Sequence, residues 1–247
     1  MAGLEELFPW FTDLLQWIET NQWTWYWAGV VIYVFFWIVS LPLLFGYEWQ
    51  LWPKPGLRKY YQKWNARTVS AMGLWTALYI AVMALSAFIW IIPGVIAFWP
   101  LWFVLLVLLP IMFGYPAVFA TALSNFLGDI VLGWITVFPL LGYIPNNMGP
   151  TWIGWKIFQR DPSLKTAKSW IYWFIAANIY IIFGSLLWCT SLALFGMYPV
   201  PGIFPARLAW DFIMGYLLIW LQPPLLIVFK SINDRYKINR VDDVTYD

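Results

Sequence analysis

Asp129 is the residue whose position in the sequence most clearly calls for a chemical explanation. It lies in a long apolar stretch, residues 116–134, and no other Asp or Glu occurs between Glu48 and Asp161. A carboxylate within a transmembrane segment costs about 2.5–3.5 kcal/mol on insertion scales. Such a group faces a bundle interior, a water-filled cavity or a partner side chain. We therefore treat Asp129 as a candidate functional residue, with a purely structural role as the alternative.

Thr121 and Asn125 precede Asp129 at intervals of four residues, so the three side chains share one face of a helix. If this segment enters the membrane at residue 116 on the inner side, Asp129 lies about 20 Å into a hydrocarbon core of about 30 Å. The polar stripe is therefore expected in the outer half of the membrane.

Two further segments place polar side chains at a similar depth. Arg207 and Asp211 are four residues apart at the start of the last apolar segment, and Asn146 and Asn147 lie where prolines and glycines interrupt the segment 140–158. Interrupted helices at membrane depth are tolerated where they line a cavity or are buried in protein. One interpretation is a ligand pocket open to the outside. The other is a buried ion pair of Arg207 with Asp211 or Asp129 that holds the helices together.

The segment 169–197 is expected to extend this polar layer. Asn178 lies on a face similar to that of Ser185 and Cys189. A tryptophan is also expected in the pocket. The candidates are Trp75, Trp134, Trp152, Trp188 and Trp210.

The elements that must position these residues are membrane spans. The chain has 247 residues, of which 62% are hydrophobic and only 11% charged, against about 25% charged in soluble domains. It has no histidine, which excludes His-ligated haem, HExxH zinc sites and His-based acid–base catalysis, and its single cysteine excludes an intrachain disulfide. We expect an integral membrane protein of the plasma membrane with no cofactor and no metal.

Hydropathy and turn residues predict seven spans. An amphipathic helix over 4–18 is expected to lie in the interface before the first span, and the basic segment 53–67 is predicted to form a short amphipathic helix on the anionic leaflet. Nucleic-acid binding is not expected, because basic residues beside membrane spans are the default. The spans are 27–46, 70–90, 97–109, 116–134, 140–158, 169–197 and 206–229.

The distribution of lysine and arginine predicts the topology. Three basic groups, in 54–67, 156–168 and 230–240, fall on one side of a seven-span arrangement. Since positive residues stay inside, the N-terminus is expected outside and the C-terminus inside.

A ridge of small residues marks the second span. Gly73, Ala77 and Ala81 follow one another at intervals of four residues, which lets another helix approach closely. Internal packing alone explains most such ridges, and docking of a partner protein is the more specific alternative.

Residues 76–158 resemble the substrate-binding S component of energy-coupling factor (ECF) vitamin transporters. The likeness combines an Ala-rich helix (ALYIAVMALSAFIWIIPG), a Pro/Gly turn, a short apolar span, FGYPAVFATALSNFLGDIVLG and a helix broken around IPNNMGP. The resemblance implies a ligand pocket near the outer face. It also implies that Ala77 and Ala81 contact a shared transmembrane coupling subunit driven by ATPases. ATP hydrolysis would occur in those partners, since the chain has no GxxxxGK[ST] motif.

The expected fold is an all-α membrane bundle. Residues 68–237 form a six-helix, S-component-like core, preceded by residues 1–67 with the amphipathic helix, an additional span and the basic segment, and followed by a cytoplasmic tail, 238–247. The additional span is a departure from the six-helix family.

The leading functional hypothesis is a membrane subunit that binds a small organic nutrient for uptake. The alternative is a structural accessory subunit that contacts lipids and neighbouring subunits. An enzyme is not expected: an intramembrane aspartyl protease needs a GxGD-like motif, but Phe126 stands two residues before Gly128, and the only other carboxylate at this depth, Asp211, has Arg207 beside it.

Overall fold

The computed structural model describes residues 9–50, 53–86, 90–92, 96–97, 100–133, 139–238 and 244–246. The described chain is mainly helical, and five helices are long and apolar enough to cross a membrane. This confirms an α-helical membrane protein. The five helices are Gln22–Leu44, Ala66–Ser86, Tyr115–Leu132, Ala167–Leu194 and Ile203–Tyr236, and a shorter apolar helix spans Trp102–Phe113.

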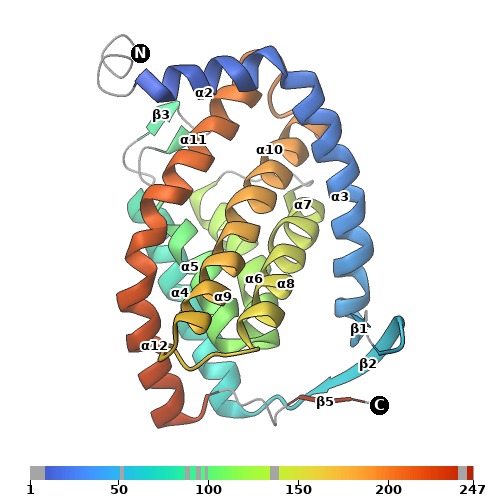
Figure 1. The fold of residues 1–247 in the computed structure, drawn as a ribbon, viewed down its shortest axis with the longest axis vertical. Helices are drawn as coiled ribbons and strands as arrows, with labels where there is room; N and C mark the ends of the chain where they lie inside the picture. The colour runs from blue at the N-terminus through green and yellow to red at the C-terminus, as the bar shows by residue number, and fades with distance from the viewer. Residues whose placement is uncertain are drawn as a thin grey trace.

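The N-terminal helix α2 (Pro9–Thr20) lies across one end of the bundle and leads directly into α3 (Gln22–Leu44), which runs along its side (Figure 1). The helix predicted over 4–18 is therefore present from Pro9, and residues 4–8 lie outside the described part. Ile18 of α2 is fully buried in a cluster with Leu208. Helix α2 thus packs against the bundle with one face.

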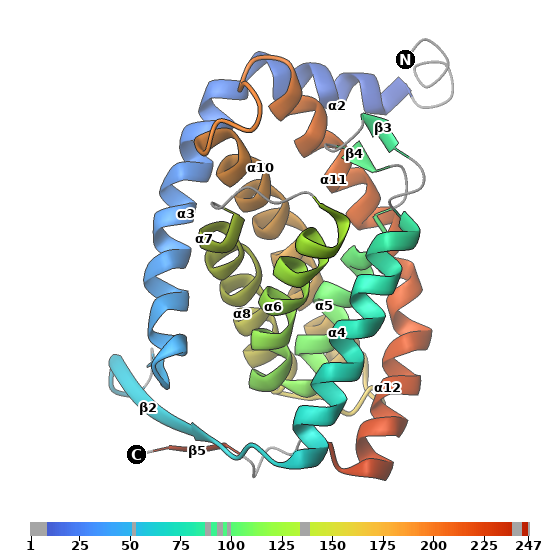
Figure 2. The ribbon, with the colours of Figure 1, turned by 180° about the vertical axis from the view of Figure 1, so that it is seen from behind.

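Helix α5 (Trp102–Phe113) is the central helix of the bundle. Ten of its 12 residues are buried, which explains why its sequence is apolar on all sides. Helices α4 (Ala66–Ser86) and α6 (Tyr115–Leu132) pack against each other and against it. Figure 2 shows α4 on the outer side of α5 and α6.

Two helical stretches contain a wider, π-helical turn, and the sequence predicts irregularity at the first of them. Residues 139–158 form α7 (Pro139–Tyr143), the π turn η1 (Ile144–Met148) and α8 (Gly149–Phe158), so the break expected around IPNNMGP is a π turn within a continuous helical stretch. Proline removes a backbone donor, and a π turn accommodates the interruption without ending the helix.

A second π turn, η2 (Tyr180–Gly184), lies in the next helical stretch, between α9 (Ala167–Ile179) and α10 (Ser185–Leu194). The C-terminal stretch joins α11 (Ile203–Leu218) to α12 (Gln222–Tyr236) through the 3₁₀ turn η3 (Ile219–Leu221).

The prediction of an amphipathic helix over 53–67 is wrong. Strand β2 (Gly56–Gln62) lies between β1 (Tyr47–Gln50) and β5 (Val244–Tyr246) in an antiparallel sheet. Prolines on both sides of Lys54 disfavour a helical start. Pairing on both edges of β2 supplies its backbone hydrogen bonds, a long-range effect that the local sequence does not show.

A second, short antiparallel pair, β3 (Trp90–Ile92) with β4 (Ile96–Ala97), lies at the opposite end of the bundle, near α2 (Figures 1 and 2). It lies between the spans predicted over 70–90 and 97–109 and overlaps each of them by a single residue.

The three basic groups of the sequence gather at the end of the bundle that carries β2. Lys156 forms an ion pair with Glu48, and Arg67 donates a hydrogen bond of 2.6 Å to the carbonyl oxygen of Tyr236. The C-terminal tail joins this end through β5 (Figure 1).

Candidate functional site

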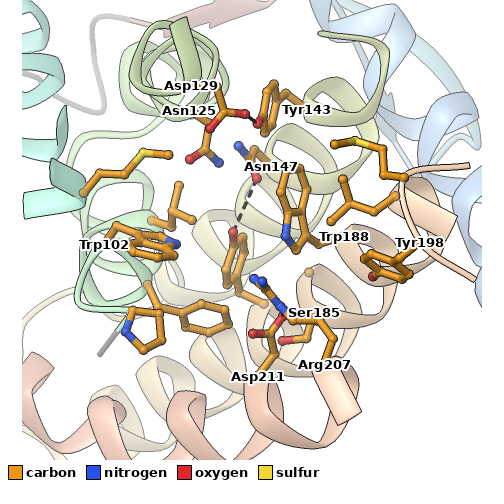
Figure 3. Close-up of a pocket in the computed structure, with 18 residues that line it drawn as sticks. Trp102, Asn125, Asp129, Tyr143, Asn147, Ser185, Trp188, Tyr198, Arg207 and Asp211 are labelled. Carbon is orange, nitrogen blue, oxygen red and sulfur yellow. Dashed lines mark hydrogen bonds and ion pairs between the residues drawn. The ribbon is translucent and has the colours of Figure 1, made fainter. Parts of the chain in front are cut away.

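A cavity of about 110 Å³ lies among α5, α6, η1, η2, α10 and α11 (Figure 3). It is lined by six of the predicted site residues, which four separate stretches of the chain bring together. These residues are Asn125, Asp129, Asn147, Trp188, Arg207 and Asp211.

Asp129 is buried, with 5% of its surface exposed, and lies on the cavity wall. The hydroxyl of Tyr143 donates a hydrogen bond to its carboxylate. Within the described residues, no Lys or Arg forms an ion pair with Asp129. Only Arg240 among the lysines and arginines falls outside that part, in the C-terminal tail. The carboxylate therefore faces the cavity without a cationic partner from the core.

Arg207 and Asp211 form the second charged element of the cavity. The Nε atom of Arg207 lies 3.0 Å from Oδ2 of Asp211, one helical turn away, and both side chains are buried. Of the two ion pairs considered from the sequence, the structure contains Arg207–Asp211. The thiol of Cys189 lies 3.8 Å from the same carboxylate oxygen, so Cys189 packs behind the pair.

The two asparagines of η1 point to different neighbours. Asn147 lines the cavity: its amide nitrogen donates to the carbonyl oxygen of Thr121 at 3.4 Å, and its amide oxygen accepts from the hydroxyl of Tyr180 at 3.3 Å. Asn146 instead donates to Oγ of Ser191 on α10 at 3.1 Å.

Thr121 shares the helix face of Asp129 but does not reach the cavity. Its hydroxyl donates to the carbonyl oxygen of Val118 at 2.8 Å, within its own helix. The predicted stripe therefore contributes two of its three members to the cavity wall, Asn125 and Asp129. The amide oxygen of Asn125 accepts a hydrogen bond from the hydroxyl of Tyr79.

Asn178 does not line the cavity. It donates to the carbonyl oxygen of Phe174 at 2.7 Å and accepts from the hydroxyl of Tyr216 at 2.8 Å, in a half-buried position outside the cavity lining. The π turn η2 lies between Asn178 and Ser185 and rotates the helix face, because a π turn contains more residues than an α turn. A regular 3.6-residue spacing across this segment therefore misplaces Asn178.

Aromatic side chains complete the walls. Tyr143 and Trp188 stack with ring centroids 5.3 Å apart, and Tyr180 and Trp102 also line the cavity. Figure 3 shows Trp102 and Trp188 on opposite sides, with Asp129 and Tyr143 toward one rim and Arg207 and Asp211 toward the other. Sequence reasoning missed the tyrosines, although a Tyr within an apolar span signals a buried hydroxyl that needs a partner.

The lining is suited to binding a polar molecule with an apolar part. It combines aromatic faces with one ion pair, one additional carboxylate and side-chain amides. Within the described ranges, no group of three His, Cys, Asp or Glu side chains has the arrangement of a metal site.

A second buried carboxylate, Glu48, lies at the opposite end of the bundle. It forms ion pairs with Arg58 and with Lys156, whose Nζ is 2.7 Å from Oε2, and it accepts a hydrogen bond from Tyr115. Tyr246 of β5 covers the cluster, with the Arg58 guanidinium 3.5 Å from its ring centroid. Burial tends to raise the pKa of Glu48, but the charge of Lys156 and the hydrogen bonds from Lys156, Tyr115 and Arg58 outweigh burial and hold this pKa below its usual value.

The predicted docking ridge lies on the outer surface of α4. Gly73, Ala77 and Ala81 are all exposed, and a Cβ atom added at Gly73 would meet no atom within 4 Å. The described chain does not use this face for internal packing.

Comparison with protein-family models, curated proteins and solved structures finds no match to this chain. The geometry of the cavity and of the surrounding helices therefore provides the basis for a functional proposal.

Proposed function

We propose that the protein is a membrane-embedded subunit that binds a small organic nutrient for uptake, with transport energised by a partner ATPase module. The observation that carries this proposal is the cavity itself, in which Asp129, Asn147 and Arg207 from three separate helical stretches converge. Convergent polar groups among aromatic walls are typical of small-molecule sites.

The proposed arrangement in the membrane has seven spans, with the N-terminus outside. The short helix α5 and the helical stretch 139–158 add two spans to the five long helices. The basic groups at one end of the bundle favour that end as the cytoplasmic side. Asp129 lies toward the C-terminal end of α6, away from the basic end, so the cavity belongs to the outer half in this arrangement.

Energy coupling is proposed to use the exposed ridge of α4. A shared transmembrane subunit, as in ECF transporters, would pack its helix against Gly73, Ala77 and Ala81, and its associated ATPases would hydrolyse ATP. Small side chains allow backbones to approach closely, and the exposure of all three residues supports this role.

Copurification tests the proposal. The full-length protein, purified in mild detergent from its native membrane, is expected to retain a small molecule that mass spectrometry identifies and that supports cellular uptake. Asp129→Ala is expected to abolish retention and uptake, whereas Asn178→Ala, outside the cavity, leaves both unchanged. Unchanged uptake with Asp129→Ala, together with the absence of any retained molecule, would contradict the proposal.

The second candidate is a structural accessory subunit of a larger membrane complex. The buried Arg207–Asp211 pair favours it, since the two charges on α11 neutralise each other without any ligand. This role predicts that the protein copurifies with other subunits in a fixed ratio and that its cavity holds no small molecule.

A further inference from the structure

The charges around the cavity do not balance. The only charged side chains among its described lining residues are Asp129, Asp211 and Arg207. Arg207 is already paired with Asp211 at 3.0 Å, so these two side chains present no net charge to a ligand. Asp129 has the hydroxyl of Tyr143 as its partner and no cation among the described residues. The ionised cavity therefore carries a single uncompensated negative charge.

We propose that the ligand of this cavity is a small organic cation whose ammonium group lies against the Asp129 carboxylate and the surrounding aromatic rings. This inference rests on the proposed binding function and specifies its substrate class. A buried carboxylate without a counter-charge is costly, and a cationic ligand supplies that counter-charge when it binds.

The aromatic walls fit the same class of ligand. Tyr143, whose hydroxyl contacts Asp129, also stacks on Trp188, so the carboxylate and the indole belong to one continuous wall. Aromatic faces attract ammonium groups by about 0.5–2 kcal/mol, and the attraction increases when the cation is desolvated. A quaternary or protonated amine thereby gains both a charge partner and aromatic contacts.

The same geometry disfavours anions. Arg207 is the only cationic side chain of the described lining, and its charge is matched by Asp211. An anionic ligand would have to break this pair and would also meet Asp129. The cavity volume of about 110 Å³ limits the ligand to a small molecule.

Three probes of nearly the same shape test the charge preference. Choline, its neutral isostere 3,3-dimethylbutan-1-ol and the anion 3,3-dimethylbutanoate would be titrated into the purified full-length protein at constant ionic strength, with calorimetry and the melting temperature as readouts. Choline is expected to bind at least tenfold more tightly than the alcohol, and the anion not to bind. Asp129→Asn is expected to abolish the preference for choline, whereas Asn178→Ala preserves it.

The three probes are compared on the unmodified protein, so this part of the test does not depend on whether Asp129→Asn folds. Equal binding of choline and the alcohol, binding of the anion alone, or no binding of any probe would each overturn the cation proposal. The binding function itself is judged separately, by whether a small molecule copurifies with the protein. A copurified neutral or anionic molecule would support that function and refute the cation.

Discussion

Helix α6 connects two buried carboxylates that have opposite surroundings. Its first residue, Tyr115, donates a hydrogen bond to Glu48, and Asp129 follows 14 residues later, about 20 Å along the helix. Glu48 has two cations and a tyrosine around it. Asp129 accepts a hydrogen bond from Tyr143 and lines the cavity.

From this difference we expect the Glu48 carboxylate to stabilise the fold and the Asp129 carboxylate to bind a ligand. The partners of Glu48 come from β2, α8 and α6, so this cluster ties α3 and the β1–β2 hairpin to the bundle core. Its side chain is completely enclosed, which leaves no room for a ligand. Asp129 joins fewer elements and leaves part of its carboxylate facing the cavity. We expect substitutions at the first site to change stability and substitutions at the second to change binding.

The largest loss of stability is expected from breaking the Arg207–Asp211 pair, in which, as at Glu48, a buried carboxylate has a cationic partner, but which lies in the cavity. Arg207→Met leaves Asp211 buried without a counter-charge and is expected to lower the free energy of unfolding by about 3–5 kcal/mol. Thermal unfolding in detergent measures this loss.

The double variant Arg207→Met/Asp211→Leu provides the control. It removes both charges and is expected to recover most of the stability, because an apolar pair of similar volume replaces a buried ion pair at little cost. If the single and double variants were equally unstable, the ion pair would not be the cause.

Glu48→Gln is expected to cost about 2 kcal/mol, because it leaves two cations and the Tyr115 hydroxyl poorly matched. The loss is smaller than at Arg207, since the Arg58 and Lys156 side chains are 30% and 26% exposed and remain partly solvated. Asp234→Asn, which breaks the exposed pair with Lys230, is the matched control and is expected to change stability by less than about 1 kcal/mol.

The pH dependence of stability gives an independent check on Glu48. Because the surroundings of Glu48 hold its pKa in the folded protein below the ordinary value of about 4.5, its stabilising contribution is complete above that ordinary value and is lost as the pH falls through the folded-state pKa. The melting temperature of the unmodified protein should therefore fall more steeply below about pH 4.5 than that of Glu48→Gln. Parallel acid profiles would show that Glu48 does not hold the hairpin.

Close packing between α3 and the core offers a smaller test. A Cβ atom at Gly149 would lie 2.2 Å from a ring carbon of Phe36 on α3, so Gly149→Ala must displace the Phe36 ring or the helix that carries it and is expected to cost about 1–3 kcal/mol. Gly73→Ala, in open space on α4, is the control and should leave stability unchanged or slightly raised. Equal stability of the two variants would indicate that α3 is not firmly packed on η1 and α8.

Sequence periodicity predicts much of this fold because most of its helices are regular. The helix with Asn125 and Asp129, the pair Arg207–Asp211 and the buried position of Asn147 all follow from spacing within one segment. The sheet is different. Strand β2 is stabilised by partners before it and at the C-terminus, and local composition contains no signal for either pairing.

The parts of the site that escape prediction depend on long-range contacts or irregular turns. Asn178 turns away from the cavity because η2 interrupts the helical period, a feature that single-residue propensities do not reveal. The Glu48 cluster joins residues up to 108 positions apart, so the sequence presents Glu48 only as a residue at the end of a span. The contact between Tyr143 and Asp129 likewise joins two different helices, α7 and α6.

The smallest expected change in stability is at Asp129 itself. Asp129→Asn keeps the shape of the side chain and an acceptor for Tyr143 while removing an unbalanced charge, so the free energy of unfolding should change by no more than about 1 kcal/mol and could increase. The same variant is expected to lose choline binding, which distinguishes it from Glu48→Gln, where stability falls and binding persists. Melting temperatures and choline titrations on both variants measure this separation. A large loss of stability in Asp129→Asn would place Asp129 in the same structural class as Glu48.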